Sequence, residues 1–324
     1  MAHWLFRLRT SLARLWGDSA PLTAIGLAML PLLAASLLGL WLDPRSIAGA
    51  PAWLKPAKFA ASIAVYSLTL AWAFRYLPRH PRVRRWVGGI SAGVFAIEFA
   101  IIALQAWRGQ RSHFNTSSLL DGALFTIMGA SIVLQTLSSV AVAVALFRER
   151  FADRALGWAL RLGLCITILG ASIGGLMTRP TPAQLEGMRT APPAVIGAHT
   201  VGAPDGGPGL PGTGWSRDHG DLRVPHFFGL HALQVLPLVA IGLRRSRRPE
   251  RQRVRLLLSS AASYAGLVGL LLWQALRGRP LLDAGTVTAL LVWAVASLLG
   301  PYLIETLNHR GASRGGAFQK LPAR

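Results

Sequence analysis

Cysteine and charged residues are scarce in this sequence, and each scarcity excludes a class of protein. A single cysteine, Cys165, occurs in 324 residues, which leaves no disulfide framework and no cysteine-based metal motif. Charged residues make up 15% of the chain and hydrophobic residues 52%, whereas an ordinary soluble domain has roughly 25% charged residues. The high apolar fraction also excludes a disordered basic protein. The class that remains is an integral membrane protein with several spans.

Acidic residues are few as well: 13 stand against 34 basic residues, for a formal charge of +21. A nucleic-acid-binding protein gathers such charge on one face, between aromatic or groove-reading elements. Here the basic residues are spread over short segments between apolar runs, so no nucleic-acid partner is expected. The richest segment, 244–255, holds seven arginines and is predicted to contact anionic lipid at the cytoplasmic face of the membrane. No sequence motif indicates a protein partner.

Eight apolar runs are near 20 residues long, the length of helix that crosses a hydrocarbon core of about 30 Å. In lipid the backbone must satisfy its own hydrogen bonds, so each run is predicted to be a helix. The fold class is therefore all-α, a polytopic integral membrane protein with eight transmembrane helices. The predicted spans are 21–42, 57–77, 86–107, 122–147, 155–177, 225–243, 254–276 and 284–307.

Basic residues are unequally distributed between the two sides of these spans. One side, which includes both chain ends, carries 22 lysines and arginines, against 11 on the other. By the positive-inside rule both termini are cytoplasmic, and we expect a multi-pass protein of the bacterial inner membrane. Leucine and tryptophan at helical spacing predict an interfacial helix over 1–19, and 310–324 is predicted to be a cytoplasmic tail. The run 21–42 is longer than a signal-peptide core, so its retention is expected.

A short pattern occurs twice in the chain. The letters Q-A-x-R-G, then a link, then L-L-D begin at residue 105 and again at residue 274. Each copy joins an odd-numbered span to the next, so we predict two four-helix halves, 20–154 and 155–309, related by an axis along the membrane normal. Two interpretations are open: a hairpin device that closes each half, or a pair of polar ligand-binding sites facing a shared outer cavity. The residues concerned are Gln105, Arg108, Asp121, Gln274, Arg277 and Asp283.

The connection between the fifth and sixth spans, 178–224, is long and rich in turn-forming residues. It has 47 residues, among them nine glycines and seven prolines. A loop of this length is typically a lid, a binding loop or disordered. We expect its last third to be ordered over the outer mouth of the bundle, with Asp221 and Arg223 as candidate ligand-binding residues.

Histidines are concentrated on the same outer side. Pro225 fits the first turn of the sixth span, which leaves His226 at the head-group level and His231 roughly 7–8 Å deeper. These two lie about 140° apart on a helix and so do not share one metal, whereas His231 and Gln234 share a face. A histidine at this depth can ligate haem, accept a proton from a quinol or bond to a neighbouring helix, and all three stay open. His113, after the third span, is a further cofactor-binding candidate.

Glu98 lies near the centre of the third span, between Ile97 and Phe99. Burying a carboxylate there costs several kcal/mol unless it is protonated or paired, so it is a candidate functional residue. Gln105 is seven residues further and on the same face, and the two could line one polar track to the outer surface. The structural alternative is a protonated Glu98 that bonds a serine across helices.

Two strings resemble segments of uncharacterised bacterial multi-spanning membrane proteins. They are RSHFN at 111–115 and GDLRVPHFFGLHALQ at 220–234. In architecture alone, eight helices in two four-helix halves with both ends inside are similar to the haem A synthase group. That group's glutamate–histidine helix motifs are absent from this sequence.

The sequence thus predicts an outward-facing polar site roofed by the long loop. We expect redox chemistry with haem or a quinone, or small-ligand binding, through His226, His231 and His113. A proton-coupled small-molecule transporter using Glu98 and Gln105, and an accessory subunit without chemistry, are the alternatives. No nucleotide loop or nucleophile elbow occurs, so whether the protein is an enzyme is left open.

Overall fold

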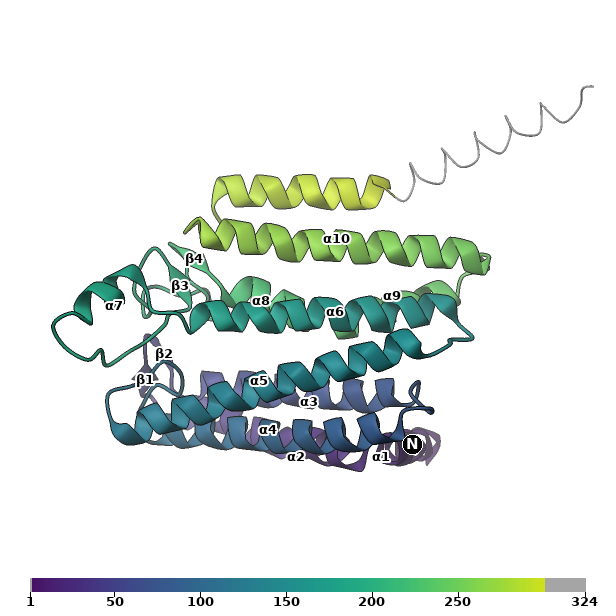
Figure 1. The fold of residues 1–324 in the computed structure, drawn as a ribbon, viewed down its shortest axis with the longest axis horizontal. Helices are drawn as coiled ribbons and strands as arrows, with labels where there is room; N and C mark the ends of the chain where they lie inside the picture. Colours follow the sequence, from purple (N-terminus) through teal and green to yellow (C-terminus); the bar gives the residue numbers. More distant parts are fainter. Residues whose placement is uncertain (1, 301–324) are drawn as a thin grey trace, which may run out of the picture.

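The computed structural model describes residues 2–300, with side chains from residue 9 onward, and it is a stack of long helices (Figure 1). The first five helices are α1 (Ala2–Asp18), α2 (Ala20–Leu42), α3 (Leu54–Phe74), α4 (Pro81–Trp107) and α5 (Leu119–Arg148). They are followed by α6 (Arg154–Met177), α7 (Pro182–Gly187), α8 (Arg223–Leu230), α9 (Ala232–Arg244), α10 (Glu250–Leu276) and a final helix, Ala284–Gly300. Two antiparallel pairs of short strands, β1 (Ser46–Ile47) with β2 (Ala50–Pro51) and β3 (Thr200–Val201) with β4 (Gly220–Asp221), lie in the connections.

Six of these helices are long and apolar enough to cross a membrane, and α8 with α9 forms a seventh candidate bent by 43°. The prediction of a polytopic all-α membrane protein is therefore confirmed, with six or seven spans. The eighth predicted span, 284–307, corresponds to the shorter apolar helix Ala284–Gly300, and its remaining residues lie outside the described part of the chain. The predicted tail, 310–324, also lies outside it.

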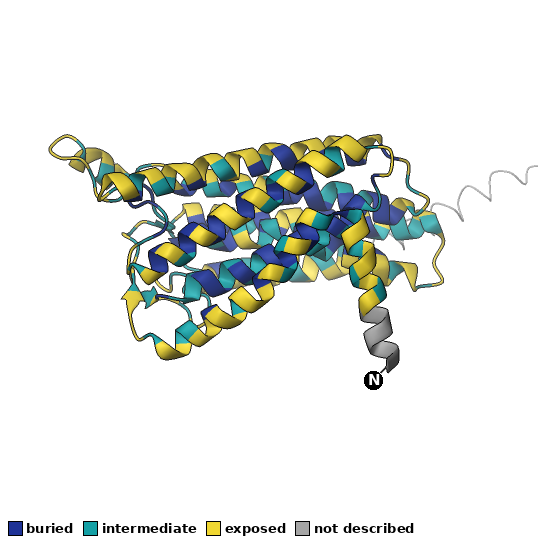
Figure 2. Cartoon of the chain, turned by 90° about the horizontal axis from the view of Figure 1, so that it is seen from below, coloured by how far each residue is buried: buried dark blue, intermediate teal, exposed yellow. Residues whose placement is uncertain are grey.

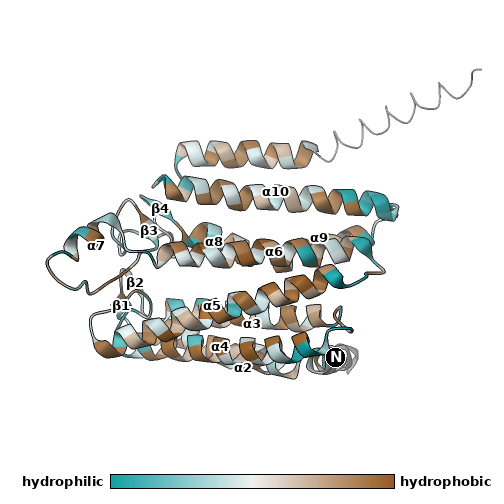
Figure 3. Ribbon diagram, viewed as in Figure 1, coloured by the Kyte–Doolittle hydropathy of each residue, from teal (hydrophilic) through white to brown (hydrophobic). Residues whose placement is uncertain are grey.

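Apolar side chains cover the flanks of the helices. Leu137, Leu169 and Leu238 are 63%, 64% and 66% exposed although each lies in the middle of a long helix. Buried residues follow the inward faces of the bundle (Figure 2), and hydrophilic residues gather at the two ends of the helices (Figure 3). This arrangement suits a protein surrounded by lipid, because apolar side chains are stable both in the protein interior and on the surface that faces the hydrocarbon of the bilayer.

The core is built where the helices cross. Leu146, Leu160 and Leu233 are fully buried and join α5, α6 and α9 in one hydrophobic cluster. α2 packs against α3 and α4, while α6 packs against α8, α9 and α10. A smaller cluster around Phe95 and Phe99 fills the space among α2, α3 and α4.

The sixth predicted span is not a continuous helix, because it breaks at His231 between α8 and α9. Side chains of neighbouring helices take up the backbone groups that the break exposes. Thr167 Oγ1 donates to the Leu230 carbonyl (3.2 Å) and accepts from the Leu233 N–H (3.2 Å), and Tyr264 Oη donates to the Phe228 carbonyl (2.6 Å). A helix break in lipid is stable only when such partners exist.

Candidate polar site at the loop end

The connections 43–53, 108–118, 178–222 and 277–283 meet at one end of the bundle, which we call the loop end (left in Figure 1). The long loop is tied to this end along its length. Ile196 N–H donates to the Phe114 carbonyl and Thr116 N–H to the Ala194 carbonyl (both 2.9 Å), while Leu222 N–H donates to the His199 carbonyl (3.0 Å). The loop is thus ordered over more than the last third that the sequence predicts.

Three histidines converge beneath this loop: His113 from the α4–α5 connection, His199 from the loop and His226 from α8. The Phe114 ring lies between the first two, with ring centroids 6.1 Å from His113 and 4.8 Å from His199. Burial, followed by the nearby Lys55, His199 and His226, holds the pKa of His113 well below its ordinary value. We call His113, His199 and His226 the histidine cluster.

The Nδ1 atoms of two of these histidines are held by acceptors. His199 Nδ1 lies 2.7 Å from Asp205 Oδ2, and His226 Nδ1 lies 2.7 Å from the Gly170 carbonyl oxygen. A carbonyl or an ionised carboxylate can only accept, so the proton of each neutral ring is assigned to Nδ1. The Nε2 atom of each ring is then a hydrogen-bond acceptor with no partner among the described residues.

The His199–Asp205 pair is the most strongly organised part of the cluster. Burial alone would raise the pKa of Asp205, but the hydrogen bonds from the His199 ring and from the His199 and Thr200 N–H groups (3.0 and 2.9 Å) outweigh it and lower that pKa. Burial likewise lowers the pKa of His199, against the opposing effect of Asp205. The pair is therefore a carboxylate that orients a neutral imidazole, an arrangement suited to accepting a proton.

The backbone at Phe114 is strained, with a φ angle of 64° in the left-handed region, and its side chain is only 3% exposed. Gly197 makes room for it: a Cβ on Gly197 would lie 2.8 Å from Phe114 Cδ1 and 2.4 Å from the Met177 carbonyl oxygen. A strained residue persists only where its surroundings over-determine it, and such residues cluster at functional sites.

Two lysines at the start of α3 add positive charge to the cluster. Lys58 Nζ donates to the Thr213 carbonyl (2.7 Å), which anchors the loop. Lys55 is half-buried, and its ammonium lies 5.9 Å from the centroid of the Phe59 ring. It has no hydrogen-bond acceptor in the part of the chain that the structure describes.

Asp221 and Arg223 form a structural tie rather than an open site. Arg223 Nη2 lies 2.6 Å from Asp221 Oδ2 and 2.7 Å from the Gly214 carbonyl, and Ser216 N–H donates to the same carboxylate (2.7 Å). The Asp221 side chain is 3% exposed, so the pair closes the end of the loop onto α8.

His231 and Gln234 lie apart from the histidine cluster. The His231 ring packs against Phe227, with centroids 4.5 Å apart, at the break between α8 and α9. The Gln234 side chain is close to that ring, and its amide nitrogen and oxygen are buried. His231 thus lies at the helix break, whereas His226 belongs to the histidine cluster.

Glu98 and Gln105 do not form one continuous hydrogen-bonded track. Glu98 is 1% exposed, and neither carboxyl oxygen has a hydrogen-bond partner among the described residues. The predicted cross-helix bond to a serine is thus not made. The Gln105 amide is instead used in a closed network with Asp121 and Arg108.

The two copies of the Q-A-x-R-G pattern end their helices alike but use their polar residues differently. Gly109 and Gly278 both adopt left-handed φ angles, 69° and 70°. In the first copy Asp121 Oδ1 accepts from Gln105 Nε2 (2.8 Å) and Arg108 Nη1 (2.7 Å), and Ser118 rather than Asp121 is the N-cap of α5.

In the second copy no such network forms within the described residues. Arg277 stacks on the Trp273 ring at 4.9 Å, Gln274 Oε1 is buried without a partner, and Asp283 accepts from the Gly285 and Thr286 N–H groups. The three second-copy residues are therefore not gathered into a ligand site.

Substituting the two aspartates by asparagine tests this difference. Asp121→Asn removes the charge that pairs with Arg108 and that accepts four side-chain donors, so we expect the free energy of unfolding to fall by about 2–3 kcal/mol. Asp283→Asn keeps an acceptable N-cap and should change it by less than about 0.5 kcal/mol. Thermal unfolding of both variants in the same detergent measures this, and equal effects would contradict the assignment.

Our site prediction missed Lys55, His199 and Asp205, and of these only Lys55 has a signal in the sequence. Lys55 and Lys58 are two of only three lysines in an arginine-rich chain, and both lie where a span begins. His199 and Asp205 are six residues apart in a loop, where only the folded turn brings them together.

Among residues 2–300, no group of three or more His, Cys, Asp or Glu residues is arranged to hold a metal ion. The sequence matches no protein-family model, and comparison with curated proteins and with solved structures finds no similar chain.

Proposed function

We propose that this multi-pass membrane protein binds a small hydroxylated ligand of the hydroquinone type beneath the long loop. The observation that carries the proposal is the His199–Asp205 pair lying near an ammonium group, Lys55, that has no hydrogen-bond acceptor of its own within the described residues. Their requirements are complementary: His199 Nε2 needs a donor, and Lys55 needs an acceptor.

A hydroxyaromatic ligand meets both requirements at once. Its hydroxyl donates to His199 Nε2, and a second oxygen accepts from Lys55. The aromatic rings of Phe59 and Phe114 supply apolar contacts of the kind that small-molecule sites offer. His199 then accepts the hydroxyl proton, while Asp205 stabilises the imidazolium that forms.

His113 and His226 complete the site as orienting residues. His226 Nε2 is an acceptor because Nδ1 is held by the Gly170 carbonyl. The same nitrogen could instead ligate a haem iron, which is the competing hypothesis for this residue. Arginine distribution supports placing the loop end on the outer face of a bacterial inner membrane with both termini cytoplasmic.

Binding of a short-chain hydroquinone to the full chain in nanodiscs, followed by tryptophan fluorescence, tests the proposal. We expect Lys55→Met and His199→Ala each to weaken binding at least about tenfold. His219→Ala is the matched control, because this ring lies in the same loop but makes no hydrogen bond within the described residues. Equal binding by all variants, or a Soret band lost in His226→Ala without hydroquinone binding, would overturn the proposal.

Proton-coupled transport is a second candidate, favoured by the burial of Glu98 without a partner. In that function Glu98 takes up a proton in the middle of the bundle and releases it toward Lys55. The similar helix ends at Gly109 and Gly278 support two related halves that could move against one another. Loss of proton-coupled uptake in Glu98→Gln, with hydroquinone binding unchanged, would favour this function over the first.

A further inference from the structure

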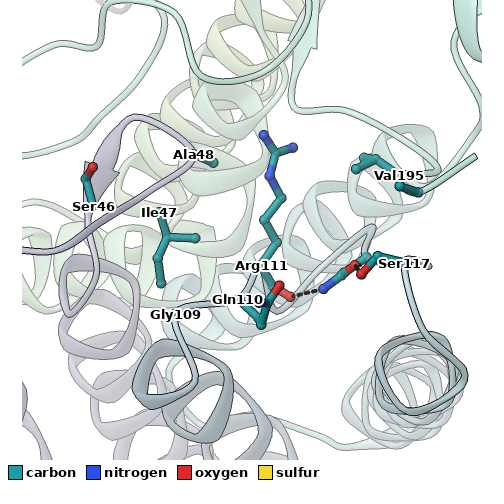
Figure 4. Close-up of a pocket in the computed structure, with 10 residues that line it drawn as sticks. Ser46, Ile47, Ala48, Gly109, Gln110, Arg111, Ser117 and Val195 are labelled. Carbon is teal, nitrogen blue, oxygen red and sulfur yellow. Dashed lines mark hydrogen bonds between the residues drawn. The ribbon is translucent and has the colours of Figure 1, made fainter.

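A pocket opens at the loop end, and its lining does not include the histidine cluster. Its volume is about 310 Å³ (Figure 4). The β1–β2 turn forms one wall, the α4–α5 connection forms the floor, and Val195 from the long loop closes the other side. None of the lining residues is acidic.

Arg111 is the only charged residue that lines this pocket. Its side chain extends from the floor between Ala48 and Val195 (Figure 4). The Arg111 carbonyl accepts from Asn115 Nδ2 (3.4 Å), which fixes the backbone, while the guanidinium has no acceptor among the described residues. An arginine without a counter-ion in an open polar pocket is a binding site for an oxyanion.

Two other arginines at the loop end already have carboxylate partners. Arg45 is paired with Asp43 at 2.7 Å, and Arg108 is paired with Asp121 at 2.7 Å. The carboxylates of Asp43 and Asp121 are thus already paired with other arginines and do not cancel the positive charge of Arg111.

Exposed tryptophans and leucines place the pocket at the depth of lipid head groups. Trp41 lies in the last turn of α2 and is 81% exposed, Trp107 ends α4 and is 68% exposed, and Leu119 begins α5 and is 96% exposed. Tryptophan is enriched where a membrane protein passes from hydrocarbon to head groups. The phosphate of a phospholipid held by Arg111 would therefore lie at the membrane interface. The acyl chains of that lipid would lie against exposed leucines of α5.

We infer that this pocket binds the phosphodiester group of a phospholipid through Arg111. The guanidinium donates two parallel hydrogen bonds to the phosphate oxygens, and the exposed amide of Gln110 is an additional donor at the rim. The inference is independent of the proposed hydroquinone site, because the two sets of residues are different.

Binding of dihexanoyl phosphatidylglycerol to the full chain in detergent, measured by native mass spectrometry, tests the inference. We expect Arg111→Gln to lower its affinity at least tenfold and Arg111→Lys to lower it less, because lysine keeps the charge but not the paired donors. Arg189→Gln is the control and should leave the affinity unchanged, because Arg189 follows α7, is exposed and does not line the pocket.

Competition by inorganic phosphate distinguishes the two possible sources of the bound oxyanion, a lipid head group and a free anion. Weak or undetectable competition by phosphate supports a lipid ligand, whereas competition at the affinity of the lipid would identify a free-anion site and overturn the lipid assignment. Equal lipid binding by the wild type and by Arg111→Gln, with both proteins folded by circular dichroism, would also overturn it.

Discussion

Replacing Gly170 by alanine should destabilise the protein by about 3 kcal/mol, although it adds a single methyl group. A Cβ on Gly170 would lie 2.5 Å from the Gly229 backbone carbon, and one on Gly229 would lie 2.5 Å from Gly170 Cα. Two backbones in contact cannot yield as a flexible side chain can, so α6 and α8 must move apart. The His226 Nδ1 bond to the Gly170 carbonyl is then lost as well.

Gly175→Ala is the matched control in the same helix, since a Cβ there meets no atom within 4 Å. This change should stabilise the protein by about 0.5–1 kcal/mol, because alanine is the better helix former. Thermal unfolding followed by tryptophan fluorescence compares the two. The close crossing of α6 and α8 would be refuted by equal stability of both variants.

Asparagine at position 205 should release the long loop without unfolding the helices. The Asp205 carboxylate accepts from the His199 ring and from two backbone N–H groups. The NH2 group of an asparagine cannot accept a hydrogen bond, so at least one of these three donors would lose its acceptor. The loss of charge-assisted hydrogen bonds amounts to about 2–3 kcal/mol, or a roughly 30- to 150-fold larger open population of the loop. Hydrogen exchange of residues 196–201 measures this population.

Acidic pH should open the same loop in the wild type. Since burial lowers the pKa of His113 and of His199, both are neutral in the docked loop, whereas an undocked histidine titrates near 6.5. The undocked state therefore binds more protons below that pH, and docking weakens as the pH falls through about 6.5. Above it, exchange rates corrected for intrinsic pH dependence should stay constant.

Asp205 contributes in a different range of pH. Its pKa is lowered, so its stabilising effect is present above the ordinary aspartate value and is lost only as the pH falls below about 4. An opening of the loop confined to pH below 4 would therefore assign the effect to Asp205 and contradict the role of the histidines.

Most helices could be predicted from the sequence because a span is defined by a run of consecutive apolar residues within the helix itself. The predicted run 86–107 falls within α4, and 155–177 matches α6 to within one residue. The break at His231 could not be predicted in this way, because the groups that stabilise it, Thr167 and Tyr264, belong to α6 and α10.

The candidate site was predictable only in part for a similar reason. His113 and His226 are predicted as site residues because they are histidines at the outer ends of spans, and both belong to the histidine cluster. Asp205 is defined by hydrogen bonds from His199 and Thr200 that only the folded turn creates, and it leaves no local pattern. Lys55 is defined by a missing acceptor, and its only signal in the sequence is that lysine is rare in this chain. In the repeated segments the aspartate is of a type that suits the N-cap of the following helix, and Asp283 takes that role. Asp121 instead pairs with Gln105 and Arg108, and the pattern does not predict this network.

Docking of the long loop onto the α4–α5 connection is the central claim, since it brings His199 to His113. Asn115 and Val195 are antiparallel partners across this contact, flanked by two backbone hydrogen bonds. Such a pair has its side chains close enough for a disulfide. In a Cys165→Ser background, Asn115→Cys with Val195→Cys should form that disulfide under mild oxidation, detected by mass spectrometry, while Asn115→Cys with Gly207→Cys should not. Free thiols in the first pair would contradict the docked loop and the site built beneath it.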